Sequence, residues 1–185
     1  MEGLDMFCLD DDSAPTHDCQ LRIDVKLVGE SSVPNLIGAV LFASGLLHLF
    51  ALFATGSDWS GPLSLRKPAL FGISAGVTVW SLVWVVKQLV PRIHDNRLAF
   101  LLAGGLLIEV GLITVQQWRG VASHFNRSTP IDAAIESIML SVVLAVTAGI
   151  AWLCWRARWL RPMDDAQAIA IRAGLWLLLI SCGIG

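Results

Sequence analysis

The sequence has no tyrosine and few charged residues: Asp, Glu, Lys and Arg together make up 15% of its 185 residues. Soluble globular domains usually contain about 25% charged residues. The formal net charge is −2, so the chain lacks the basic excess that is typical of nucleic-acid-binding proteins. The composition is therefore not that of an ordinary soluble domain, and we expect no nucleic-acid partner.

The common catalytic and metal-binding motifs are also missing. The four cysteines, Cys8, Cys19, Cys154 and Cys182, form no close-spaced pair, so neither a disulfide framework nor a zinc site is indicated. The sequence contains no HExxH, P-loop or CxxC motif and no Ser-His-Asp spacing that would indicate a hydrolase. We therefore favour a non-enzymatic function over catalysis.

Hydrophobic residues are abundant, at 55% of the chain with a mean hydropathy of +0.67. They are grouped in blocks of about 20 residues, the length that crosses a ~30 Å hydrocarbon core as a helix. A helix satisfies its own backbone hydrogen bonds inside lipid, so each block predicts a transmembrane helix. The predicted spans are about 33–55, 68–90, 98–118, 131–155 and 166–185. We therefore expect an all-α membrane protein, a bundle of about five transmembrane helices, after a polar tail over residues 1–32.

The Lys and Arg residues predict the orientation, because the cytoplasmic segments of membrane proteins carry more of them. Eight lie in or beside the tail and the second and fourth connections: Arg22, Lys26, Lys87, Arg92, Arg97, Arg156, Arg158 and Arg161. Four lie in or beside the first and third connections: Arg66, Lys67, Arg119 and Arg127. We expect a cytoplasmic N-terminus, with the first and third connections outside.

Polar residues in the outer half of the predicted bundle are the candidate ligand-binding residues, because a charge inside a bilayer costs at least ~2.5 kcal/mol. They are His48, Lys67, Glu109, Gln116, Arg119, His124, Asn126, Asp132 and Glu136. We expect Arg119, His124 and Asp132 to lie close to Lys67, with Glu136 and His48 beneath them, in one pocket. His48 and His124 are the candidate metal ligands.

Each candidate also has a structural interpretation. Glu109 and His48 are residue types that hold helices together by hydrogen bonds, and the third connection can be a capped loop with surface ion pairs. Gly72 and Gly76 form a small-xxx-small pair that predicts close helix packing. Thr129 followed by Pro130 and Asp132 predicts the start of the fourth span.

Two strings, LRKPALFGIS and QQWRGVASHFNRSTPIDAAI, resemble a family of uncharacterised bacterial multi-pass membrane proteins. The shared positions are Lys67, Pro68, Phe71, Ser74, Gln116 or Gln117, Arg119, Gly120, Ser123, His124, Phe125, Asn126, Thr129, Pro130 and Asp132. The resemblance covers about residues 33–155 and implies a multi-pass fold in the bacterial inner membrane, without an established activity. Family members are longer, so we expect the chain to correspond to their N-terminal half and to be a truncated form.

Three functions remain open. The first is a binding or redox module that holds a haem, quinone or metal near the outer face, with His48 and His124 as ligands. The second is a proton-linked transporter or channel that uses Glu109 and His48. The third is a structural or assembly protein of the lipid bilayer without a small ligand. We favour an outward-facing pocket for a small molecule, and a homo-oligomer stays open.

Overall fold

The computed structural model describes residues 32–56, 58–61, 64–89, 95–159 and 165–184. These residues contain five helices and no strand, which confirms the all-α fold. The helices are α2 (Ser32–Thr55), α3 (Arg66–Leu89), α4 (Asp95–Trp118), α5 (Pro130–Ala157) and α6 (Asp165–Ile184). They begin and end close to the five predicted apolar segments, whereas residues 1–31 of the predicted tail lie outside the described part of the chain.

All five helices are long and apolar enough to cross a membrane. Their outward faces carry large apolar side chains, such as Phe50, which is 72% exposed, and Leu177, which is 68% exposed. A soluble monomer rarely exposes apolar surface on this scale, whereas lipid covers it at no cost. The chain is a multi-pass membrane-embedded protein.

Proline marks the first turn of three helices. Pro34, Pro68 and Pro130 are the third, third and first residues of α2, α3 and α5. The first turn tolerates proline because its backbone N–H groups have no acceptor within the helix. At α5 the Thr129 side chain also accepts a hydrogen bond from the backbone N–H of Asp132, which confirms the predicted helix start.

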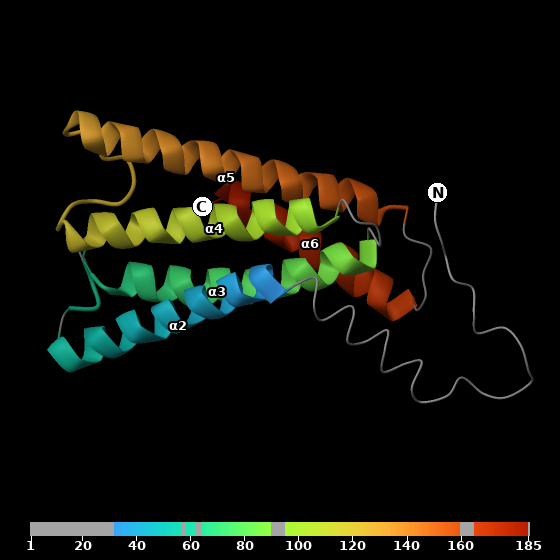
Figure 1. The fold of residues 1–185 in the computed structure, drawn as a ribbon, viewed down its shortest axis with the longest axis horizontal. Coiled ribbons are helices and arrows are strands. Elements are labelled where there is room, and N and C mark those ends of the chain that lie inside the picture. Colours follow the sequence, from blue (N-terminus) through green and yellow to red (C-terminus); the bar gives the residue numbers. More distant parts are fainter. Residues whose placement is uncertain (1–31, 57, 62–63, 90–94, 160–164, 185) are drawn as a thin grey trace, which may run out of the picture. The chain divides into compact units, whose positions relative to one another are not determined.

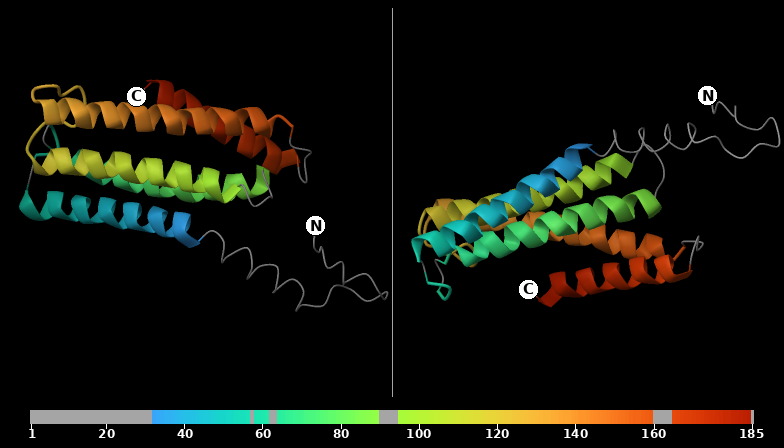
Figure 2. Two further views of the ribbon diagram at one scale, coloured as in Figure 1. Left: turned by 45° about the horizontal axis from the view of Figure 1, so that its top comes forward. Right: turned by 90° about the horizontal axis from the view of Figure 1, so that it is seen from below.

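Consecutive helices run in opposite directions, so the α2–α3 and α4–α5 connections lie at the same end of the bundle (left in Figure 1; Figure 2). The helix α3 is the most enclosed: 50% of the residues in its apolar stretch are buried inside the bundle, against 17% for α6. The core takes side chains from all five helices, including Leu41, Val79, Leu102, Ile150 and Ile171. The end that holds the two connections is called the polar end below.

The α2–α3 contact is made by glycines. A Cβ atom added to Gly72 of α3 would stand 2.7 Å from the Cα atom of Gly45 in α2. A Cβ atom on Gly76 would likewise stand 2.8 Å from the carbonyl oxygen of Gly38. Only residues without a side chain permit this backbone approach, which confirms the close packing predicted from Gly72 and Gly76.

Candidate functional site at the polar end

The C-terminus of α4 directs the chain into the α4–α5 connection through a glycine turn. Gly120 has a φ of 68°, a conformation that glycine adopts without strain. Its N–H bonds to the carbonyl of Gln117, and the N–H of Val121 bonds to the carbonyl of Gln116. These two bonds form a Schellman motif, which satisfies the last carbonyls of the helix. The turn leads the connection, residues 119–129, across the end of the bundle.

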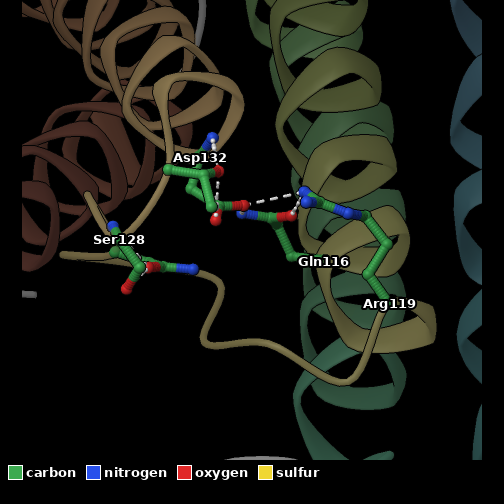
Figure 3. Close-up of polar contacts among 6 residues, drawn as sticks. Gln116, Arg119, Ser128 and Asp132 are labelled. Carbon is green, nitrogen blue, oxygen red and sulfur yellow. Dashed lines mark hydrogen bonds and ion pairs between the residues drawn. The ribbon is translucent and has the colours of Figure 1, made fainter.

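Asp132, on the first turn of α5, is the centre of a buried hydrogen-bond network (Figure 3). Its Oδ1 accepts from the Arg119 guanidinium at 2.8 Å and from the Gln116 amide at 3.2 Å, and its Oδ2 accepts from the Thr129 hydroxyl at 2.7 Å. Arg119 also donates to the Gln116 side-chain oxygen. Asp132 and Gln116 are only 2% and 1% exposed. The network joins α4 to α5 and leaves neither carboxylate oxygen without a donor.

A second polar contact crosses from α3 to the α4–α5 connection. The Lys67 ammonium lies 3.5 Å from the Ser123 hydroxyl, and that hydroxyl lies 3.0 Å from Nδ1 of His124. The His124 ring also stands near the Phe71 ring, with 6.2 Å between centroids. Ser123 is buried and His124 is half-buried, so these side chains are packed into the end of the bundle.

The surroundings of His124 favour its neutral form. Burial lowers the pKa of the imidazole below its ordinary value, and the positive charge of Lys67 lowers that pKa further. The carboxylate of Glu136 acts in the opposite direction and raises the pKa. Because the two lowering effects prevail, His124 is uncharged at neutral pH and presents one donor and one acceptor.

The charges at the polar end do not balance. Arg119 pairs with Asp132 at 2.8 Å, and Arg127 pairs with Glu136 at 2.9 Å. Lys67 forms no ion pair with any residue that the structure describes. Arg66 and Asp58, also at this end, form no ion pair with a described residue either, so four cations stand near three acids. The Arg66 guanidinium lies over the Trp59 ring, whereas the Lys67 ammonium lies beside Ser123 and His124.

His48 belongs to a different contact. Its Nδ1 lies 2.8 Å from the Ser44 carbonyl oxygen, to which it donates, and its Nε2 accepts from the Trp118 indole N–H at 3.3 Å. Both ring nitrogens are thus occupied, in the tautomer with the proton on Nδ1. The contacts of His48 join α2 to α4 and, among the described residues, include none of the other candidates.

Asn126 and Glu109 are the remaining candidate ligand-binding residues. The Asn126 side-chain oxygen accepts from the backbone N–H of Ser128 at 3.1 Å and from its hydroxyl at 2.8 Å, a local turn within the connection. Glu109 lies half-buried along α4, below the polar end. The structure thus brings Lys67 together with His124 and joins Gln116, Arg119 and Asp132 in a neighbouring network.

Ser123, Trp118 and Thr129 are contact residues that were not among the candidates. Ser123 bridges Lys67 and His124, Trp118 occupies one nitrogen of His48, and Thr129 binds Asp132. Ser123 and Thr129 are shared positions of the string that resembles the bacterial family, and that resemblance is the sequence signal that could have identified them. Trp118 lies in the same string but is not one of its shared positions.

Two further features bear on ligands. Among the residues that the structure describes, no three His, Cys, Asp or Glu side chains converge to hold a metal ion. A groove of about 610 Å³ lies between α3 and α6, away from the polar end, and its lining includes Trp80, Trp84 and Leu175. The groove is apolar and faces the region where lipid is expected.

Neither a protein-family model, nor a curated protein, nor a solved structure matches this chain.

Proposed function

We propose that this chain is a multi-pass protein of the bacterial inner membrane that binds a small anion at its polar end. The observation that carries the proposal is the half-buried ammonium of Lys67, which lies against Ser123 and His124 and forms no ion pair with a described residue. Removing an ammonium group from water costs free energy unless a counter-charge offsets it. A bound anion supplies that charge.

The neighbouring groups suit an anion of carboxylate or phosphate size. One of the three N–H donors of Lys67 points to Ser123, so two remain for a ligand. Ser123 and neutral His124 have one donor hydrogen each, and their mutual hydrogen bond uses one of the two, so together they offer one more donor. Asp132 and Glu136, which would repel an anion, are already paired with Arg119 and Arg127. Hydrogen bonds from a charged donor are about twice as strong as neutral ones, so Lys67 is the main affinity determinant.

The anion is favoured over a haem held by His48 and His124. Haem ligation through both histidines needs a free nitrogen on each, and both nitrogens of His48 hydrogen-bond to protein groups. No catalytic motif accompanies the site in the sequence, so the proposal is binding and not catalysis.

The orientation is part of the proposal. The eight-to-four distribution of Lys and Arg supports a cytoplasmic N-terminus and an outward-facing polar end. Reporter fusions at Ser123 and Arg158 test it: a reporter active outside the membrane is expected at Ser123, and a cytoplasmic reporter at Arg158. Cytoplasmic activity at Ser123 would reverse the orientation.

Binding is tested with the full chain in lipid nanodiscs and inorganic phosphate or acetate as probes. We expect one of the two anions to raise the thermal unfolding midpoint, and Lys67→Met to weaken its affinity by about tenfold or more. Lys87→Met, at the other end of the same helix, is the matched control and should bind like the wild type. Equal affinity of Lys67→Met and the wild type would refute the site.

A further inference from the structure

Glu109 lies near mid-depth of its candidate span, which runs from Arg97 to Trp118. At a rise of 1.5 Å per residue it stands roughly 14 Å from Trp118 and roughly 18 Å from Arg97. The side chain is half-buried. A carboxyl group at this depth is surrounded by protein and hydrocarbon and not by bulk water.

Glu109 lies on the face of α4 that contacts α5. Gly105, four residues earlier on that face, is so close to α5 that an added Cβ atom would stand 2.5 Å from a methyl group of Val146. Gln116, seven residues later on the same face, bonds to Asp132 of α5. Residues four and seven apart on a helix share one face, so Glu109 is directed towards the α4–α5 contact.

Glu109 forms no hydrogen bond or ion pair with any residue in the described part of the chain. Hydroxyl groups elsewhere on α4 and α5 do have acceptors. Thr114 donates to the Val110 carbonyl of its own helix at 2.8 Å, and Ser141 donates to the Ser137 carbonyl of α5 at 2.8 Å. The usual structural explanation, a polar side chain that joins two helices, therefore does not account for Glu109.

Among the described residues of α3, α4 and α5, no cation is placed to stabilise an ionised carboxylate at this depth. The other ionisable residues of α3, α4 and α5 occur towards the helix ends: Arg66, Lys67, Lys87, Asp95, Arg97, Asp132, Glu136, Cys154 and Arg156. Of the two acids on α5 nearest the polar end, Asp132 is paired with Arg119 and Glu136 with Arg127. An unpaired carboxylate in a medium of low dielectric constant is costly, and binding a proton removes that cost.

We propose that Glu109 is a proton-binding site inside the membrane, a carboxylic acid that is protonated at neutral pH. The site takes a proton as its ligand. It is separate from the proposed anion site at Lys67, so each can fail without the other.

A protonated carboxyl group in an apolar setting is the kind that a hydrophobic carbodiimide modifies. The acid transfers its proton to a carbodiimide nitrogen, and its oxygen adds to the central carbon. The resulting O-acylisourea rearranges to a stable N-acylurea, with no atom lost.

The first measurement is the infrared difference spectrum between the wild-type chain and Glu109→Gln, both in lipid nanodiscs at pH 7. We expect a carboxylic C=O stretching band in the wild type that Glu109→Gln lacks. Glu136→Gln is the matched control, since its carboxylate is paired with Arg127 near the polar end, and it should keep the band. Absence of the band from the wild type at pH 7 overturns the proposal.

The second measurement assigns the site. Dicyclohexylcarbodiimide should modify Glu109 at pH 7, as located by peptide mass spectrometry, whereas a water-soluble carbodiimide should not. Modification of Glu109 only below about pH 5, as for a carboxyl in water, would also overturn the proposal. Glu109→Gln preserves side-chain shape, so its elution profile checks that any loss of signal does not come from unfolding.

Discussion

The α2–α3 and α4–α5 contacts are built on different physical principles. In the first, Gly45 and Gly72 bring two backbones together. In the second, Asp132 joins the ends of two helices through a buried ion pair and two further donors. The first contact depends on shape and is indifferent to charge, whereas the second depends on a complete set of hydrogen-bond partners. The two contacts should therefore fail in response to different substitutions.

The largest effect is expected for Gly45→Leu in the α2–α3 contact. A Cβ atom there would stand 2.5 Å from the Ile73 backbone nitrogen and 2.8 Å from the Ala69 carbonyl oxygen. Backbone cannot move aside as a side chain can, so we expect a loss of about 3 kcal/mol or more, measured by thermal unfolding in detergent. Gly104→Leu is the control, since a Cβ atom at that glycine meets nothing within 4 Å. Equal stability of the two variants would contradict the backbone contact.

Asp132→Ala should be the next most damaging change. It leaves the Arg119 guanidinium and the Gln116 amide without their acceptor, and removing one partner of a buried pair costs about 3–5 kcal/mol. We expect the lower end of this range, because Arg119 is 36% exposed. The comparison variant is Glu136→Ala, whose partner Arg127 is 69% exposed and which should lose no more than about 1 kcal/mol. If both variants unfold alike, the network is not the stabilising element of the α4–α5 contact.

A smaller effect is expected for Thr129→Ala. The substitution removes the acceptor for the Asp132 backbone N–H and the donor to its Oδ2, while the ion pair to Arg119 remains. Loss of an N-cap side chain costs about 1 kcal/mol, which unfolding experiments with the purified variant can resolve. Thr129→Ser keeps the hydroxyl and should restore most of the stability. A loss as large as that of Asp132→Ala would mean that Thr129 organises the whole network.

The smallest expected effects concern the titration of His124. Its pKa in the folded protein lies below the unfolded value near 6.5, so the unfolded chain binds more protons. The neutral imidazole therefore contributes stability that is fully present above pH 6.5 and is lost as pH falls through and below that value. Unfolding midpoints recorded between pH 5 and 8 should rise with pH, and less so in His124→Gln.

Two substitutions sharpen this prediction because they act on the pKa of His124 in opposite directions. Lys67→Met removes a charge that lowers the pKa, so the pKa should rise, whereas Glu136→Gln removes a charge that raises it, so the pKa should fall. Histidine NMR titration of the three proteins measures both changes. A pKa that does not respond to Lys67→Met would show that Lys67 does not act on His124.

The helices were largely predictable from the sequence because their signals are local. An apolar block of about 20 residues reports a span whatever its neighbours are, and Pro130 after Thr129 marks a helix start within a few residues. The packing of Gly72 and Gly76 was also predictable, since small residues four apart form one smooth face. That the partner face is Gly38 and Gly45 of α2 became visible only in the structure.

The site was less predictable because its contacts join distant parts of the chain. Lys67 and Ser123 are 56 residues apart, and His48 and Trp118 are 70 apart. Helical spacing gives the face on which a side chain lies, but not the rotation of that helix against its neighbours. One pocket was therefore expected, whereas the structure has a Lys67–Ser123–His124 group, an Asp132 network and a separate His48–Trp118 contact.

The sequence by itself determined that this protein is a set of five apolar helices, where each helix lies to within about three residues at its start, and which polar residues are costly in a membrane. These properties depend on composition and on contacts within a few residues. The tertiary structure decided which polar residues meet: it gave Asp132 a full set of donors, occupied both nitrogens of His48, and left Lys67 and Glu109 without a counter-charge among the described residues. The physical reason is that pairing of side chains depends on helix order and rotation, which arise only when the whole bundle packs.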